Sequence, residues 1–306
     1  MAATDTDRQL AWEARQRPRA AIAALAAAIL IPAGTLWTGA VFANAPLGDF
    51  VASLQQALEP GPIGGRPSVG TQFFQYYSDH LPEIIGSSVL RAIGLVGLGW
   101  VLTLLAVAVR GRRPEFPRAA VYIGLVGAVL SALATLLGAV GSAIAVNHFL
   151  DGTRTVDAAA EVSSESLPVT AGILGLVGQL ALASGLILVS LNAMRTGLIV
   201  RFLGILGVIL AVLLVLQIAA PLDVFIQSIW LFVLALLLTG RGPGGLPLAW
   251  RTGQAQPWPS AAEVAAARRA AATEGSTEPE PEAEPAAEPS VPASQAAARR
   301  KRKRRN

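Results

Sequence analysis

The chain has 306 residues, 53% of them hydrophobic and 14% charged, and a formal net charge of +4 at pH 7. Soluble domains carry about 25% charged residues, so this composition excludes an ordinary soluble protein and indicates a membrane protein. The sequence contains no cysteine, which excludes disulfides, cysteine nucleophiles and cysteine-ligated metals.

Long apolar runs predict transmembrane helices, because a bilayer core about 30 Å thick needs about 20 apolar residues. Four runs meet this length: Ala21 to Phe42, Ala92 to Val109, Ala119 to Val146 and Pro168 to Met194. The stretch from Phe202 to Thr239 is long enough for two more helices, with Pro221 and Asp223 marking a turn between them. We therefore predict an all-α, polytopic bundle of six spans over residues 21–240, preceded by an N-terminal arm of residues 1–20.

The first apolar run has an alternative interpretation as a signal peptide. The string "ANA" at Ala43 to Ala45 has the small-x-small form of a signal-peptidase site. Against this, the run is longer than a typical signal core, and Pro46 would follow the cut. We therefore predict a retained helix.

The arginine distribution predicts the orientation, because cytoplasmic loops are enriched in Lys and Arg. Arginines cluster in the N-terminal arm and in the loops after the second and fourth spans: Arg8, Arg15, Arg17, Arg19, Arg110, Arg112, Arg113, Arg118, Arg195 and Arg201. The intervening loops hold only Arg66 and Arg154. Both termini are therefore predicted to be cytoplasmic. A five-span alternative would place the arginine-rich tail outside, against the same rule.

Glycine-rich strings recur in the apolar runs. "IGLVG" occurs at 93–97 and 123–127, with related strings at 174–178 and 203–207. These echoes suggest either a duplicated pair of spans, as in some transporters, or chance in a Gly, Leu and Val composition. The third run also places small residues on one helical face, which predicts close helix packing: Gly127, Ser131, Ala134, Gly138 and Ser142.

Few polar residues fall in or near the spans. Arg91 lies inside the second span if that span starts at Ile84, and at its outer boundary if it starts at Ala92, which we favour. Four amides are predicted to form interhelical hydrogen bonds rather than a solute path: Gln179, Asn192, Gln217 and Gln227.

Two histidines are candidates for a cation site. His80 and His148 should lie together at the outer ends of neighbouring spans, near acidic Asp79, Glu83 and Asp151. Loop histidines beside acids are usually solvated, so no metal is predicted. The string "FFQYY" at 73–77 is interpreted as part of an outer aromatic belt. The sequence has no catalytic or cofactor motif, so no catalytic or cofactor-binding residue is assigned and the protein is not predicted to be an enzyme.

Residues 241–306 are predicted to form a cytoplasmic tail. An S-x-x-E capping box at Ser260 and Glu263 predicts a short helix at about 261–272, and the Glu/Pro-rich segment after it predicts a disordered spacer. The chain ends in a basic cluster: Arg299, Arg300, Lys301, Arg302, Lys303, Arg304 and Arg305. Anionic lipid headgroups are the favoured partner of this cluster. Nucleic acid is less favoured and would be bound without sequence preference, because no aromatic residue follows Trp258. A solvated tail without a partner is the other alternative.

Two strings carry a family resemblance: "SLNAMRTGLIVRFLGILGVI" at 190–209 and "GRGPGGLPLAWRTGQAQPWPSAAE" at 240–263. They resemble uncharacterised multi-pass membrane proteins of high-GC bacteria, which also tend to end in an acidic and then a basic tail. The resemblance implies a plasma-membrane protein and implies no activity. The favoured function is a non-enzymatic scaffold or partner-binding membrane protein. The alternatives are a small-solute transporter or channel and, third, an intramembrane enzyme.

Overall fold

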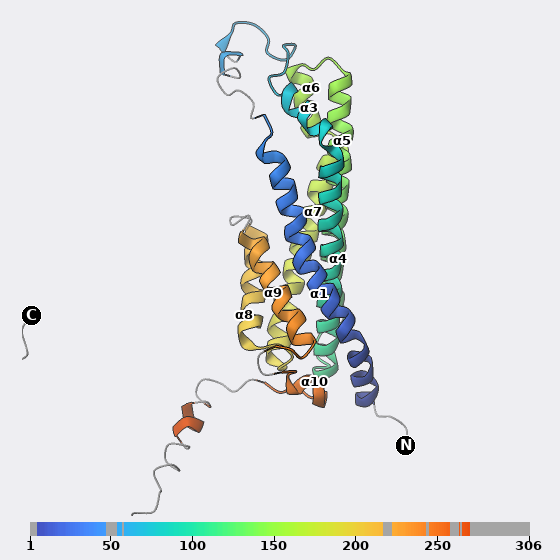
Figure 1. The fold of residues 1–306 in the computed structure, drawn as a ribbon, viewed down its shortest axis with the longest axis vertical. Helices are drawn as coiled ribbons and strands as arrows, with labels where there is room; N and C mark the ends of the chain where they lie inside the picture. Colours follow the sequence, from blue (N-terminus) through green and yellow to red (C-terminus); the bar gives the residue numbers. More distant parts are fainter. Residues whose placement is uncertain are drawn as a thin grey trace, which may run out of the picture. The chain divides into compact units, whose positions relative to one another are not determined.

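The computed structural model describes residues 5–46, 54–56, 58–216, 222–242, 245–257, 263 and 265–269. These residues form an all-helical protein (Figure 1). Four helices are long and apolar enough to cross a membrane: α1 (Asp5–Ala43), α4 (Leu81–Arg112), α5 (Arg118–Asp151) and α7 (Ser166–Arg195). Two shorter apolar helices follow, α8 (Arg201–Leu216) and α9 (Leu222–Leu238). Three small helices connect or flank them: α3 (Thr71–Asp79), α6 (Val156–Ser164) and α10 (Leu248–Thr252).

The four predicted apolar runs lie in the four long helices, but the helices extend beyond them. The arm before Ala21 is helical from Asp5 onward and continues into α1. Helix α4 starts at Leu81 rather than near Ala92. It has a proline in its first turn, where a backbone N–H would have no partner within the helix. A helix satisfies its own backbone hydrogen bonds in water as in lipid, so an apolar run does not mark where a helix ends.

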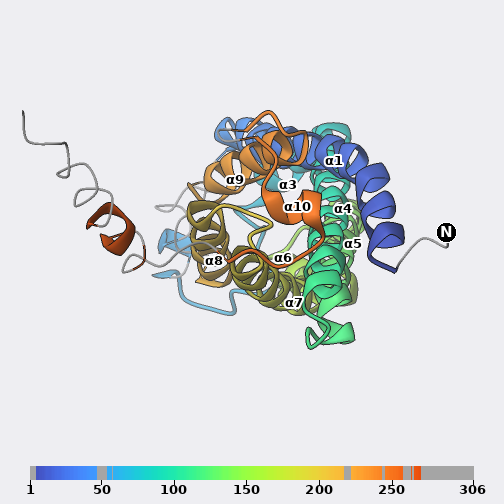
Figure 2. The same cartoon turned by 90° about the horizontal axis from the view of Figure 1, so that it is seen from below.

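The six apolar helices form a closed ring in the order α1, α4, α5, α7, α8 and α9, in which α9 packs back against α1 (Figure 2). Helices α4 and α7 also touch across the ring. We call the end that carries α10 the basal end and the end that carries α3 and α6 the distal end (Figure 1). Fully buried side chains fill the ring, including Leu102 of α4, Leu186 of α7, Leu203 of α8 and Trp230 of α9.

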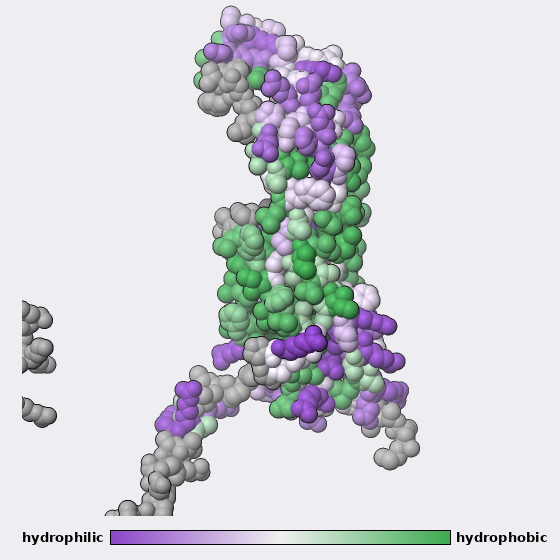
Figure 3. All heavy atoms as spheres, viewed as in Figure 1, coloured by the Kyte–Doolittle hydropathy of each residue, from purple (hydrophilic) through white to green (hydrophobic). Residues whose placement is uncertain are grey.

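The ring is complete only in the basal half, because its helices have unequal lengths. Helices α8 and α9 have 16 and 17 residues, which is about 25 Å at 1.5 Å per residue. Helix α4 has 32 residues, or about 48 Å. Among the apolar helices of the described residues, only α1, α4, α5 and α7 continue into the distal half, where the small helices α3 and α6 lie beside them. The hydrophobic surface forms a band along the helices, with hydrophilic surface at both ends (Figure 3).

The predicted small-residue face of the third apolar run packs against α7 at Gly127 and Ser131, whereas Ala134, Gly138 and Ser142 border a cavity. A Cβ added at Gly127 would run into the backbone of Leu182, and Ser131 and Gly178 meet across the same α5–α7 contact. Farther along, Gly185 of α7 lies so close to Gly124 of α5 that an added Cβ would be 2.5 Å from the Gly124 Cα. Small residues thus allow two helix backbones to touch, as proposed from the sequence.

Residues Met1–Trp258 belong to one compact unit, and the remaining residues form a second. Of the helix predicted at about 261–272, residues 263 and 265–269 are helical, and the other positions lie outside the described residues. The Glu/Pro spacer and the basic cluster at 299–305 also lie outside the described residues.

Candidate functional site

A cavity of about 710 Å³ lies between α4, α5 and α7, and it reaches the ends of α8 and α9 through Leu214 and Asp223. Its position follows from the unequal helix lengths, because within the described residues no other long helix takes the place of α8 and α9 in the distal half of the ring. In Figure 3 the surface is hollowed directly above these two helices. Ligand pockets in proteins typically measure about 300–1,000 Å³, so the cavity has the size of a small-molecule site.

Two opposite charges line the cavity. Arg91 comes from α4 and is exposed to this space rather than packed into the core. Asp223 comes from the first turn of α9, where its Oδ1 accepts a hydrogen bond of 2.9 Å from the backbone N–H of Val224. The two charges interact electrostatically. The structure thus brings together two residues 132 positions apart (223 − 91) that the sequence analysis treated separately.

Hydroxyl groups line the wall that α5 contributes. The Thr135 hydroxyl donates to the carbonyl of Ser131, and within the described residues the Ser131 hydroxyl itself is buried without a hydrogen-bond partner. Tyr77 of α3 also lines the cavity, and its hydroxyl is hydrogen-bonded with Ser142. Burial raises the pKa of Tyr77, and the Ser142 hydrogen bond opposes this shift. The phenol therefore stays neutral at physiological pH and acts as a hydrogen-bonding group.

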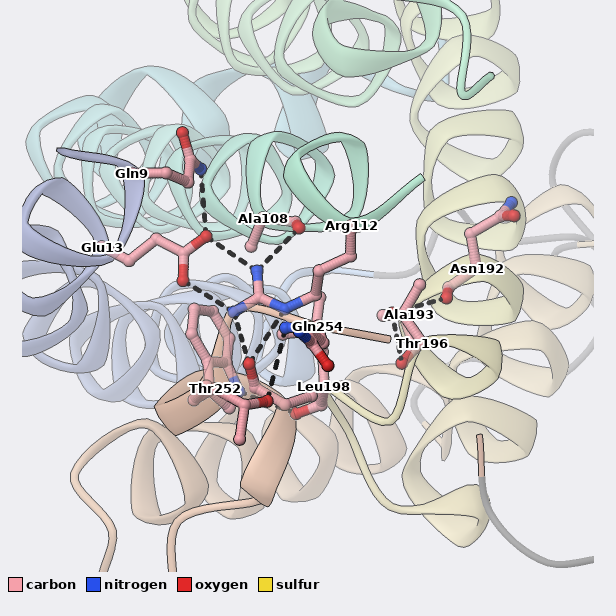
Figure 4. Close-up of polar contacts among 12 residues, drawn as sticks. Gln9, Glu13, Ala108, Arg112, Asn192, Ala193, Thr196, Leu198, Thr252 and Gln254 are labelled. Carbon is pink, nitrogen blue, oxygen red and sulfur yellow. Dashed lines mark hydrogen bonds and ion pairs between the residues drawn. The ribbon is translucent and has the colours of Figure 1, made fainter. Parts of the chain in front are cut away.

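The basal end is closed by a buried ion pair (Figure 4). The guanidinium of Arg112 binds both carboxylate oxygens of Glu13, at 2.7 and 2.9 Å, and both side chains are 1% exposed. The guanidinium also donates twice to the carbonyl of Ala249 in α10 and once to that of Ala108. Glu13 accepts a further hydrogen bond of 3.0 Å from Gln9. Every strong donor and acceptor of this pair is thus satisfied, which a buried pair requires.

Trp250 of α10 packs against the Arg112 side chain of this ion pair. The Arg112 guanidinium carbon lies 5.3 Å from the centre of its ring, and its indole N–H donates to the carbonyl of Leu198 at 2.8 Å. Arg17 stacks on the ring at 5.8 Å; burial lowers its pKa, which the Glu13 carboxylate opposes. Residues on α1, α4, α10 and the α7–α8 turn are therefore tied into one unit, which we call the basal cap.

The basal cap was missed by the sequence analysis, which assigned residues 241–306 to a tail. Only one signal was present, the string "GLPLAWRTGQAQPWP" at 245–259 that contributed to the family resemblance. Within it, the N–H of Gln256 donates to the carbonyl of Thr196, and Gly197 has a positive φ of 72° where the segment crosses. An added Cβ at Gly197 would collide with the Gln256 carbonyl, which explains the glycine.

The two histidines do not share a site in the structure. The His80 ring stacks on Tyr76, with Nδ1 2.8 Å from the Tyr76 carbonyl oxygen. The His148 Nδ1 lies 3.3 Å from Glu165, and both side chains reach solvent. Within the described residues, no group of three or more metal-ligating side chains is arranged to hold a metal ion.

The other predicted residues have local partners. Phe74 packs on Phe149, with ring centres 4.5 Å apart, and Phe73 packs on Phe42, so the "FFQYY" aromatics join α3 to its neighbours. Gln179 donates to the carbonyl of Leu214, which confirms an interhelical hydrogen bond between α7 and α8. Asn192 accepts from Arg113 across helices. Gln217 lies outside the described residues.

No protein-family model, no curated protein and no solved structure matches this chain. The resemblance to membrane proteins of high-GC bacteria therefore stays a prediction from the two quoted strings.

Proposed function

We propose that the chain is a six-span plasma-membrane protein, in which α8 and α9 form the fifth and sixth spans and both termini are cytoplasmic. The basal end carries the helix ends that hold clustered arginines, whereas the distal loops hold Arg66 and Arg154. This asymmetry supports a cytoplasmic basal end, because positive residues are retained on that side. In this orientation the cavity faces the outer half of the membrane.

The function that this geometry supports best is non-enzymatic binding of a small or amphipathic ligand in the cavity. The observation that carries the proposal is a space of about 710 Å³ that combines two charges with hydroxyl groups and apolar walls. Few polar groups placed within a largely apolar pocket are typical of ligand sites. This proposal gives the expected partner-binding role a location.

The cavity lining offers a sharp test. An added Cβ at Gly172, which lines the cavity, would meet no atom within 4 Å, so a larger side chain can enter the space without displacing the helix. Gly39 on α1 is equally open, but it does not line the cavity. We expect native mass spectrometry of the purified protein to show a bound small molecule that Gly172→Leu loses and the matched Gly39→Leu retains. Equal occupancy in both variants would reject the cavity as the binding site.

A small-solute transporter is the second candidate, and the contrast between the accessible distal side and the sealed basal half favours it. The cavity is accessible on the distal side, whereas the basal half is sealed by buried core residues and by the basal cap. Transport would require this seal to open. Movement of a solute into proteoliposomes, reduced by Gly172→Leu, would favour the transporter, whereas binding without flux would favour the binding protein.

A further inference from the structure

The two charges of the cavity indicate what kind of ligand it takes, if the proposed binding function holds. Arg91 and Asp223 come from separate helices and both face the same space. Among the ion pairs of the described residues, none joins these two side chains. Their charges interact through space, so they lie near each other without neutralising each other by a direct contact.

A ligand with a single charge would satisfy only one of these groups. An anion bound at Arg91 would be repelled by Asp223, and a cation bound at Asp223 would be repelled by Arg91. Asp223 lies in the first turn of α9, where the helix dipole favours negative charge. The guanidinium of Arg91 is permanently charged. A ligand that carries both signs of charge pairs with both groups and leaves neither uncompensated.

The cavity also has apolar walls, in addition to the hydroxyl groups of α5. Ile84 and Leu95 of α4 and Leu176 and Leu182 of α7 border the space beside the two charges. We infer that the cavity binds an amphiphilic zwitterion, with its anionic group on Arg91, its ammonium group on Asp223 and its apolar portion against these side chains. Two sources present this chemistry: a phospholipid with an ammonium headgroup, and a free amino acid with an apolar side chain.

The experiment uses the full-length protein in a nonionic detergent and three probes. Dihexanoyl phosphatidylethanolamine is a zwitterionic lipid, dihexanoyl phosphatidylglycerol is an anionic lipid of the same chain length, and leucine is a soluble zwitterion. Binding is measured by native mass spectrometry and by the shift in unfolding temperature. We expect the wild-type protein to bind at least one of the two zwitterions and to bind phosphatidylglycerol about tenfold more weakly or worse. Which zwitterion binds identifies the source.

Variants that each remove one of the two charges distinguish binding of a zwitterion from binding of an anion. Arg91→Gln and Asp223→Asn should each weaken the zwitterion about tenfold or more. Asp223→Asn should in addition strengthen phosphatidylglycerol, because it removes the repulsion that excludes a pure anion. Arg118→Gln and Asp5→Asn remove an exposed arginine and an exposed aspartate far from the lining and should change nothing. If Arg91→Gln does not fold, Asp223→Asn carries the test alone, since its two effects have opposite signs.

Equal binding of phosphatidylglycerol and the zwitterions by the wild-type protein would overturn the inference, as would failure of both zwitterions to bind. These results are separable from failure of the proposed function. If a bound molecule is still lost in Gly172→Leu and kept in Gly39→Leu, the site stands and the ligand class is wrong. If neither glycine variant changes the bound molecule, the site and the inference fall together.

Discussion

Removal of Arg112 tests whether the basal cap stabilises the whole protein. The substitution Arg112→Met keeps most of the side-chain volume and leaves Glu13 as a buried carboxylate with Gln9 as its remaining hydrogen-bond donor. Breaking a buried ion pair by removing one partner costs about 3–5 kcal/mol. The Ala249 carbonyl also loses both of its guanidinium donors. We expect a loss of about 4 kcal/mol in the free energy of unfolding.

A second substitution should partly reverse this loss. Adding Glu13→Leu to Arg112→Met removes the orphaned charge, and replacing both members of a buried pair with apolar residues is often close to neutral. The double variant should therefore be more stable than Arg112→Met alone, by about 2 kcal/mol or more. The neighbouring Arg113 provides a matched control. It makes one side-chain hydrogen bond of 3.2 Å to Asn192, so Arg113→Met should cost about 1 kcal/mol or less.

Two measurements report the outcome. Equilibrium unfolding in mixed micelles with dodecyl sulfate gives the free energies, and trypsin cleavage after Arg251 in α10 reports release of the basal cap. Arg112→Met should be cleaved faster than the wild-type protein, and the double variant should be cleaved at an intermediate rate. A loss below about 1 kcal/mol for Arg112→Met, or a double variant less stable than the single one, would refute the reasoning from buried charge.

Three further predictions address packing, topology and the tail. Gly185→Ala should lower the free energy of unfolding by about 1–3 kcal/mol, because its Cβ would press on the Gly124 backbone; Gly39→Ala, in open space, should be neutral or slightly stabilising, and equal melting temperatures would contradict the close α5–α7 contact. An impermeant thiol reagent should label Thr153→Cys but not Glu115→Cys in intact cells, since the native chain has no cysteine; the opposite pattern would reverse the proposed orientation. A peptide of residues 290–306 should bind anionic liposomes, weaken as salt rises and ignore neutral liposomes; equal binding to neutral liposomes would reject anionic lipid as its partner.

The helices could be predicted from the sequence because each long apolar run is a local signal. The small-residue face of α5 could also be predicted from the sequence, because residues three and four positions apart lie on the same face of a helix. The ends of the helices could not be predicted from the sequence. The residues before Ala92 are polar enough to break the apolar run, yet they form good helix, so α4 begins at Leu81.

The basal cap could not be predicted, because its parts are far apart in the chain. Glu13 and Arg112 are 99 residues apart, and Ala249 is 137 residues from Arg112. Each of these charged residues, taken alone, looks like an ordinary solvated side chain near a helix end. Trp250 was the one available clue, since an indole in a polar tail must be either exposed at a cost or buried against a partner.

The sequence contained a feature that predicts the cavity, although the sequence analysis did not draw on it. The stretch from 202 to 239, once divided at the turn around Pro221, leaves two helices shorter than a bilayer core of about 30 Å beside four that exceed it. Unequal lengths in a closed ring must leave space at one end. Arg91 lines that space, so its guanidinium faces the cavity together with the hydroxyl groups of α5. Asp223 lines the same space, because it lies in the first turn of α9 at the end of that helix that borders the cavity.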